Sequence, residues 1–169
     1  DLNRAVTPAH RRLAFEELFL LEMALAGRHG AVARATKPFQ VASSPGMLHR
    51  LRGMLPYRLT AAQERVIGEI LGDMTSPHPM NRLIQGDVGS GKTVVALHAL
   101  AVACASGLQA VLMVPTELLA EQHFLNLSPL CAKLGLLAVL LSGKERGAAK
   151  RERLAQIAEG TAHIVIGTH

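Results

Sequence analysis

The sequence predicts an α/β protein in which a parallel sheet with flanking helices follows an α-helical segment. Two observations predict the sheet: short apolar segments alternate with helical ones after residue 59, and a glycine-rich loop lies between a candidate strand and a candidate helix. A third observation, the prolines, serines and glycine of KPFQVASSPGM (residues 37–47), predicts a linker before this alternation begins. We therefore expect a helical linker segment over residues 1–55 and an α/β domain over residues 56–169.

The N-terminal segment is predicted to be one helix from Thr7 to about His29. Thr7 suits the N-cap position and Pro8 the first turn, while Gly27 and Gly30 indicate the end of the helix. Its leucines recur as a stripe at Leu13, Leu18, Leu21 and Leu25. The segment after the linker, LHRLRGMLPY, is short and basic.

The second part of the chain alternates strands and helices. Thr60 is expected to cap a helix whose inner face carries Ala62, Val66, Ile67, Ile70, Leu71 and Met74. The candidate strands cover residues 82–86, 110–115, 136–143 and 163–168. The candidate helices between them cover residues 92–105, the segment ELLAEQHFLNL, and residues 150–160. This order predicts right-handed crossovers and a parallel sheet.

Composition narrows the class of protein. The chain has 169 residues, 49% of them hydrophobic, which is enough for a packed core. Its most apolar stretch, residues 94–114, is interrupted by polar residues and glycine, so we expect no membrane-spanning segment. Cys104 and Cys131 lack a metal-binding spacing and are expected to be buried free thiols in a reducing cytoplasm. The net charge of +5 permits a polyanionic partner without requiring one.

The loop GDVGSGKT, from Gly86 to Thr93, has the spacing of a phosphate-binding loop. Its three glycines allow the backbone of Gly86–Gly91, which includes Asp87, Val88, Gly89 and Ser90, to turn its N–H groups toward phosphates. Lys92 supplies a charge for the β and γ phosphates, and Thr93 supplies a hydroxyl for Mg²⁺. The loop predicts nucleotide binding, but it is shared by kinases, GTPases and nucleic-acid motors.

The segments around the loop narrow the family. RLTAAQERVI, VPTELLAEQH, LSGKERG and IVIGTH follow the order and spacing of the first, RecA-like motor domain of superfamily 2 helicases. Within that group, GDVGSGKT with PTELLAEQH and the final GTH resembles the RecG-type branched-DNA helicases. The N-terminal RRLAFEELFLLEMAL and the phrase LPYRLTAAQ resemble the segment that links an upstream wedge domain to the motor in that family.

The resemblance implies an ATP-dependent helicase that acts on branched double-stranded DNA in recombination and repair, reversing replication forks and migrating Holliday junctions. It also implies ATP and Mg²⁺ as cofactors, a monomer, no membrane and a bacterial cytoplasmic location. Two alternatives stay open: a translocase of the transcription-repair coupling type, and a phosphate-loop module that is not a motor. The residues beyond both ends of this sequence would distinguish them.

The resemblance assigns further site residues. Gln63 matches the glutamine that reads adenine, although T-x-x-Q from Thr60 also predicts a capping box. Thr116, a predicted N-cap, and Thr168 and His169 match positions that contact DNA in the family. Gly143 and Lys144 are DNA-contact candidates for a different reason, because they end a predicted strand at the edge of the sheet where open α/β folds bind ligands. Whether the basic cluster of Lys144, Arg146, Lys150, Arg151 and Arg153 contacts DNA or forms a solvated helix face stays open.

Lys92 and Thr93 are the catalytic residues that this resemblance places in the sequence. The acidic pair that holds Mg²⁺ in such ATPases is expected after GTH, and the second motor domain with its arginine finger is expected further on. In-line attack on the γ phosphate needs those groups. We therefore expect this chain alone to hydrolyse ATP negligibly, and we expect the intact protein to be an ATPase.

Overall fold

The structure is a computed structural model that describes residues 7–143 and 147–168, without the side chains of residues 28, 29 and 31–34. The chain divides into two compact units. One unit contains the residues up to Pro38 together with Pro77–Pro79, and the other contains Phe39–Ser76 together with the chain from Met80 onwards. The second unit holds the sheet and the phosphate loop.

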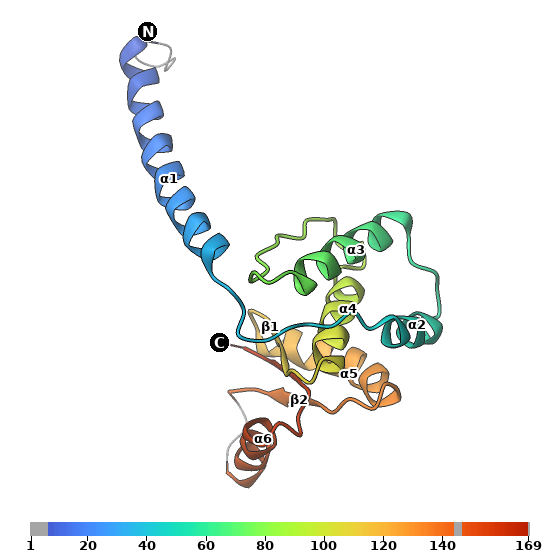
Figure 1. The fold of residues 1–169 in the computed structure, drawn as a ribbon. Coiled ribbons are helices and arrows are strands. Elements are labelled where there is room, and N and C mark those ends of the chain that lie inside the picture. The colour runs from blue at the N-terminus through green and yellow to red at the C-terminus, as the bar shows by residue number, and fades with distance from the viewer. Residues whose placement is uncertain (1–6, 144–146, 169) are drawn as a thin grey trace. The chain divides into compact units, whose positions relative to one another are not determined.

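The first unit is built on one long helix, α1 (Pro8–Arg34; Figure 1). Its start is as predicted, since the Thr7 hydroxyl accepts a hydrogen bond from the His10 amide at 3.3 Å. Its end is not, because α1 continues through Gly27 and Gly30. Neither glycine adopts the left-handed conformation that ends a helix, and a glycine inside a helix costs only about 1 kcal/mol. No helix of the described residues is long and apolar enough to cross a membrane.

The second unit begins with two helices that pack on a third. Helix α2 (Pro45–Met54) starts inside the predicted linker, where Pro45 suits the first turn of a helix. Helix α3 (Ala61–Thr75) begins with the predicted capping box at Thr60. Both helices contact α4 (Lys92–Ala105), and the buried face of α3 carries Ile67, Ile70 and Met74. Ala62, expected on this inner face, is exposed.

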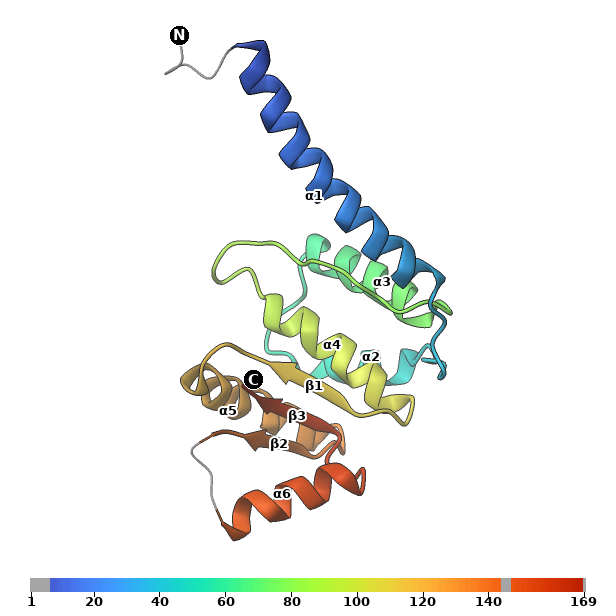
Figure 2. The same ribbon diagram turned by 90° about the vertical axis from the view of Figure 1, so that its left-hand side faces the viewer.

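Three parallel strands of the described residues form the sheet in the order β1-β3-β2. These are β1 (Ala110–Met113), β2 (Ala138–Leu141) and β3 (Ile164–Gly167). Helix α5 (Glu117–Lys133) connects β1 to β2, and α6 (Ala148–Ala158) connects β2 to β3 (Figure 2). Met113, Gly167 and Leu141 are in register, so the three strands end at one edge.

Alternating side chains of the strands face two different layers. One face packs Ile164 and Ile166 with Leu97 of α4 and Leu127 of α5 into the main core. The other face packs residues of β2 and β3, Val139 and Val165, with Ile157 of α6. At β1 this second face is open, because Val111 and Met113 are 67% and 68% exposed.

The two cysteines lie in the main core and are buried free thiols, as predicted. Burial raises the pKa of Cys104 to about 11, and burial also raises the pKa of Cys131. Both therefore stay protonated at neutral pH.

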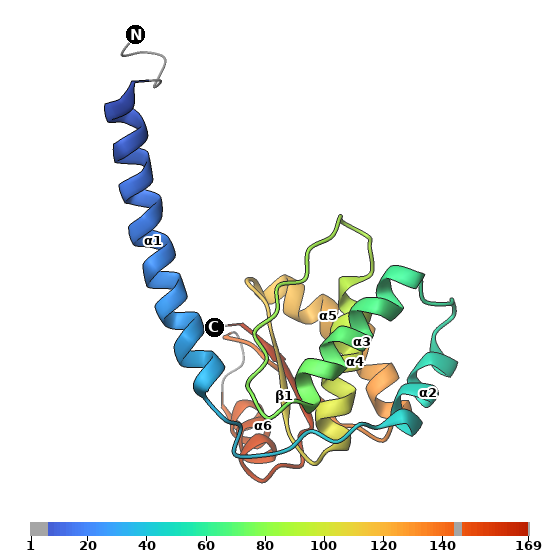
Figure 3. The same cartoon turned by 45° about the horizontal axis from the view of Figure 1, so that its top comes forward.

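The predicted strand over residues 82–86 is wrong in this structure. Arg82–Gly86 pairs with no strand of the described residues, and Leu83 is 89% exposed. Figure 3 shows this segment as coil between α3 and α4. The segment is attached to α3 instead, through hydrogen bonds from Arg82 to Asp73 and Glu69. Apolar composition alone therefore did not produce a strand here.

Candidate nucleotide-binding site

The phosphate loop turns directly into helix α4. Gly89 and Gly91 have φ angles of 83° and 80°, in the left-handed region that glycine adopts without steric cost. A Cβ on Gly86 would lie 2.8 Å from the Ser90 hydroxyl oxygen. Each predicted glycine of the loop thus has a local reason to be glycine.

The loop presents donors that have no protein acceptor. Gly91, the N-cap of α4, offers no side-chain cap to the helix. The amide N–H groups of Gly89, Gly91, Lys92 and Thr93 donate to no acceptor among the described residues. Together with the positive end of the helix dipole, these amides form a site suited to an anion.

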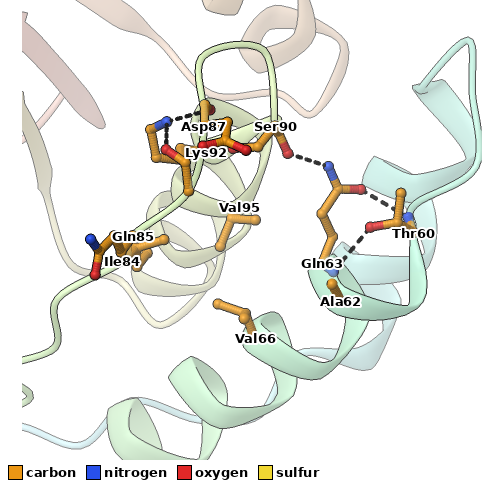
Figure 4. Close-up of a pocket in the computed structure, with 11 residues that line it drawn as sticks. Thr60, Ala62, Gln63, Val66, Ile84, Gln85, Asp87, Ser90, Lys92 and Val95 are labelled. Carbon is orange, nitrogen blue, oxygen red and sulfur yellow. Dashed lines mark hydrogen bonds between the residues drawn. The ribbon is translucent and has the colours of Figure 1, made fainter.

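Lys92 points back into the loop. Its Nζ donates hydrogen bonds to the carbonyl oxygens of Gly86 at 2.7 Å and Asp87 at 2.8 Å (Figure 4). The exposed ammonium group is therefore held beside the loop by two carbonyl groups. Thr93 is half-buried, and its hydroxyl makes no hydrogen bond within the described part of the chain. Amides, ammonium and free hydroxyl fit a nucleotide's phosphates and an accompanying Mg²⁺ ion.

Gln63 connects the start of α3 to the loop. Its Oε1 accepts from the Thr60 amide at 2.9 Å, and its Nε2 donates to the Ser90 carbonyl at 2.9 Å. Figure 4 shows the Gln63 side chain between these two groups. A Cβ on Gly91 would collide with Nε2 of Gln63. The capping box is confirmed, and the adenine contact stays a prediction that requires Gln63 to exchange these hydrogen bonds.

Two cavities adjoin the loop. The first, of about 410 Å³, lies between α3 and the loop; Gln63 and Lys92 line it together with the apolar Val66, Ile84 and Val95. The second, of about 360 Å³, is lined by Thr93 together with residues of α4 and α5 and with Leu55 and Tyr57. The two adjacent catalytic candidates, Lys92 and Thr93, therefore face different cavities.

Three of the predicted DNA-contacting residues follow the strands at the carboxyl edge of the sheet. Thr116 caps α5 as predicted, its hydroxyl accepting from the Leu119 amide at 3.3 Å. Gly143 follows β2, and Thr168 follows β3. A Cβ on Gly143 would lie 2.9 Å from Oε1 of Glu117, so the segments after β1 and β2 are in contact. No sequence pattern predicted that the Glu117 side chain lies beside Gly143.

The remaining candidates of this edge are only partly described. Lys144, Arg146 and His169 lie outside the described residues. In α6, Arg151 is exposed and Lys150 is half-buried. Arg153 donates from Nη1 to the Leu140 carbonyl at 2.5 Å, which attaches α6 to β2. Arg153 thus has a structural partner in the sheet, and DNA contact by this cluster stays an open prediction.

A parallel sheet with a phosphate loop that leads into a helix indicates a nucleotide-binding α/β domain. Comparison with known families shows which family it belongs to. The profile of the DEAD/DEAH box helicase family matches residues 60–169. Because this match covers most of the chain, the chain belongs to the DEAD/DEAH box helicase family.

Within this class, the chain is similar to proteins named ATP-dependent DNA helicase RecG. It is 44% identical to that of Synechocystis sp. over 161 residues, 43% identical to that of Bacillus subtilis over 169 and 44% identical to that of Escherichia coli K12 over 170. A solved structure of RecG bound to a three-way DNA junction superimposes with a TM-score of 0.85 and 38% identity over 94% of this chain. The predicted family resemblance is confirmed.

The chain spans only part of these proteins. The three sequence matches cover 95–100% of this chain, but only 19% of the Synechocystis protein, 25% of the B. subtilis protein and 24% of the E. coli protein. The structural match covers 22% of the solved RecG chain.

Proposed function

We propose that the intact protein containing this chain is an ATP-dependent DNA helicase or translocase that acts on branched DNA. Fork reversal and Holliday junction migration in recombination and repair are the reactions that we propose for it. The similarity to RecG over nearly the whole chain, including a solved RecG bound to a three-way DNA junction, is the observation that supports this proposal most strongly.

The phosphate loop is the proposed ATP site. The amides of Gly86–Thr93 would bind the phosphates, and Lys92 would exchange the carbonyls of Gly86 and Asp87 for the β and γ phosphates. The Thr93 hydroxyl would bind Mg²⁺, which supplies charge neutralisation at the phosphates when bound. Gln63 would contact adenine across the first cavity. The unpaired amides of the loop and the ammonium held beside them support this assignment.

The carboxyl edge of the sheet is the proposed DNA contact. Thr116, Gly143 and Thr168 would meet the DNA backbone there, with Lys144 and His169 as the further residues of the same motifs. Residues 1–55 would link an upstream DNA-binding domain to the motor, which residues 56–169 begin. A monomer in the bacterial cytoplasm is the setting that we propose.

The rate of ATP hydrolysis by the intact protein tests this proposal. We expect a three-way junction to stimulate hydrolysis much more than a linear duplex of the same length and composition. The Thr93→Ala variant serves as the control for hydrolysis at this site, and it should lose the stimulated rate. Equal stimulation by both DNAs would contradict action on branched DNA, and a stimulated rate in Thr93→Ala would contradict the assigned site.

A further inference from the structure

The segment that leads into the phosphate loop has few attachments to the rest of the unit. Residues 82–86 pair with no described strand, and Leu83 and Val88 are 89% and 103% exposed. Ile84 is half-buried and packs against the core beneath α3. The position of the loop therefore depends on the side chains that attach this segment to its neighbours.

Arg82 makes two charged hydrogen bonds that attach this segment to α3. Its Nε lies 2.6 Å from Oδ2 of Asp73, and its Nη1 lies 2.7 Å from Oε2 of Glu69. Glu69 and Asp73 are four residues apart, so both carboxylates lie on one face of α3. The planar guanidinium has its donors in a fixed fork, which can bond two carboxylates at once where a lysine ammonium holds them less specifically.

Charge and hydrogen bonding favour this arrangement. The hydrogen bond from Arg82 lowers the pKa of the Asp73 carboxyl, and the same bond raises the pKa of Arg82. The Arg82 side chain is 31% exposed, less than those of Glu69 at 41% and Asp73 at 39%. Arg82 and Asp73 therefore both stay charged through the neutral pH range.

Helix α3 contacts the loop region at two separate places. Arg82 attaches the chain four residues before Gly86, and the Gln63–Ser90 hydrogen bond attaches it four residues after. The stretch between them includes the two carbonyl groups, of Gly86 and Asp87, that hold the Lys92 ammonium. Arg82 itself does not line the cavity beside the loop.

We propose that Arg82 is a positioning residue for nucleotide binding: its bridge to Glu69 and Asp73 holds the phosphate loop in its binding geometry. This inference rests on the proposed ATP site. Without the bridge, the unpaired segment before Gly86 gains conformational freedom, which must be lost again when a nucleotide binds. The penalty therefore falls on affinity rather than on the chemical step.

The test is ATP binding and hydrolysis by the intact protein with Arg82→Gln. We expect the Kd for ATP and the KM to rise roughly three- to tenfold, with kcat at saturating ATP within about twofold of the wild type. The double variant Glu69→Gln, Asp73→Asn keeps Arg82 but removes its partners, and it should match Arg82→Gln. Arg82→Lys should retain part of the affinity.

Arg65→Gln is the matched control. Arg65 pairs with the same Glu69 at 3.6 Å along the surface of α3, but it does not contact the segment before the loop. We expect its affinity for ATP to equal that of the wild type. Thermal unfolding of each variant separates positioning from general destabilisation, since a purely structural role would lower the Tm while leaving the Kd unchanged.

The results show whether the positioning role of Arg82 or the proposed ATP site is wrong. If the wild type binds ATP and Arg82→Gln binds it equally well, the positioning role is wrong while the proposed ATP site stands. The same holds if only Arg82→Gln, and not the double variant, weakens binding, because Arg82 would then act without its carboxylate partners. If the wild type does not bind ATP, the proposed function fails and the inference fails with it.

Discussion

Alanine substitutions at the two left-handed glycines of the phosphate loop distinguish two costs: the strain of a left-handed backbone and the loss of a contact with α3. Gly89 and Gly91 have nearly equal φ angles, so alanine at either position carries the left-handed cost of about 1–2 kcal/mol. A Cβ on Gly89 meets nothing within 4 Å, whereas one on Gly91 collides with the Gln63 amide. Gly89→Ala is therefore a matched control for Gly91→Ala.

The additional cost of Gly91→Ala follows from the hydrogen bonds of Gln63. Its amide bonds Thr60 and Ser90, and each bond contributes about 0.5–1.5 kcal/mol. The Cβ collides with Nε2, so the bond to Ser90 is lost and about 0.5–1.5 kcal/mol is added. We expect Gly91→Ala to lower the free energy of unfolding by about 1.5–3.5 kcal/mol, against about 1–2 kcal/mol for Gly89→Ala.

Native-state hydrogen exchange of the intact protein, followed in peptides from residues 60–75 and 86–105, measures this difference. These peptides report on α3 and α4 separately from the rest of the protein. In a Gln63→Ala background the two glycine variants should become equivalent. Equal losses in the wild-type background, or an unchanged difference in the Gln63→Ala background, would refute the reasoning.

Three further predictions concern other parts of the second unit. Burial lowers the pKa of His98, so the unfolded chain binds more protons than the folded chain near and below pH 6.5, and stability should fall as the pH drops through that range. His98→Leu should therefore reduce the decrease in Tm between pH 7 and pH 5, and an identical decrease in the wild type and the variant would contradict this. Thr116→Ala should lower the unfolding free energy by about 1 kcal/mol because the helix cap is removed, while Thr116→Ser should keep it, as urea titration can show. Replacing Arg146, Lys150 and Arg151 with Gln should reduce the slope of log Kd for DNA against log salt by about 0.9 for each phosphate that the variant no longer neutralises; an unchanged slope would identify a solvated face.

Features set by nearby residues were predictable from the sequence. The capping box needs only Thr60 and Gln63, three residues apart, and the loop needs only the spacing of its glycines with Lys92. The parallel strands and their crossover helices followed from the alternation of apolar and helical segments. The residues of each pattern are close together in the sequence, so the pattern can be recognised without knowing the fold.

Features that depend on distant neighbours were not predictable in this way. The bond from Gln63 to Ser90 spans 27 residues, and no local pattern indicates it. Arg82 lies in a segment that was predicted to be a strand. The segment pairs with no described strand, and Arg82 instead forms hydrogen bonds to α3. The start of α2 at Pro45 was missed for a different reason, because a proline after serine fits both a linker and the first turn of a helix.

The most direct test of the central claim, that the loop from Gly86 to Thr93 binds the nucleotide that drives work on branched DNA, is junction unwinding by the intact protein with Lys92→Ala. The ammonium of Lys92 lies at the loop carbonyls and not at the carboxyl edge of the sheet, so its removal should spare DNA binding. We predict that Lys92→Ala binds a three-way junction with wild-type affinity but does not unwind it in ATP and Mg²⁺. Unwinding at the wild-type rate would contradict the claim.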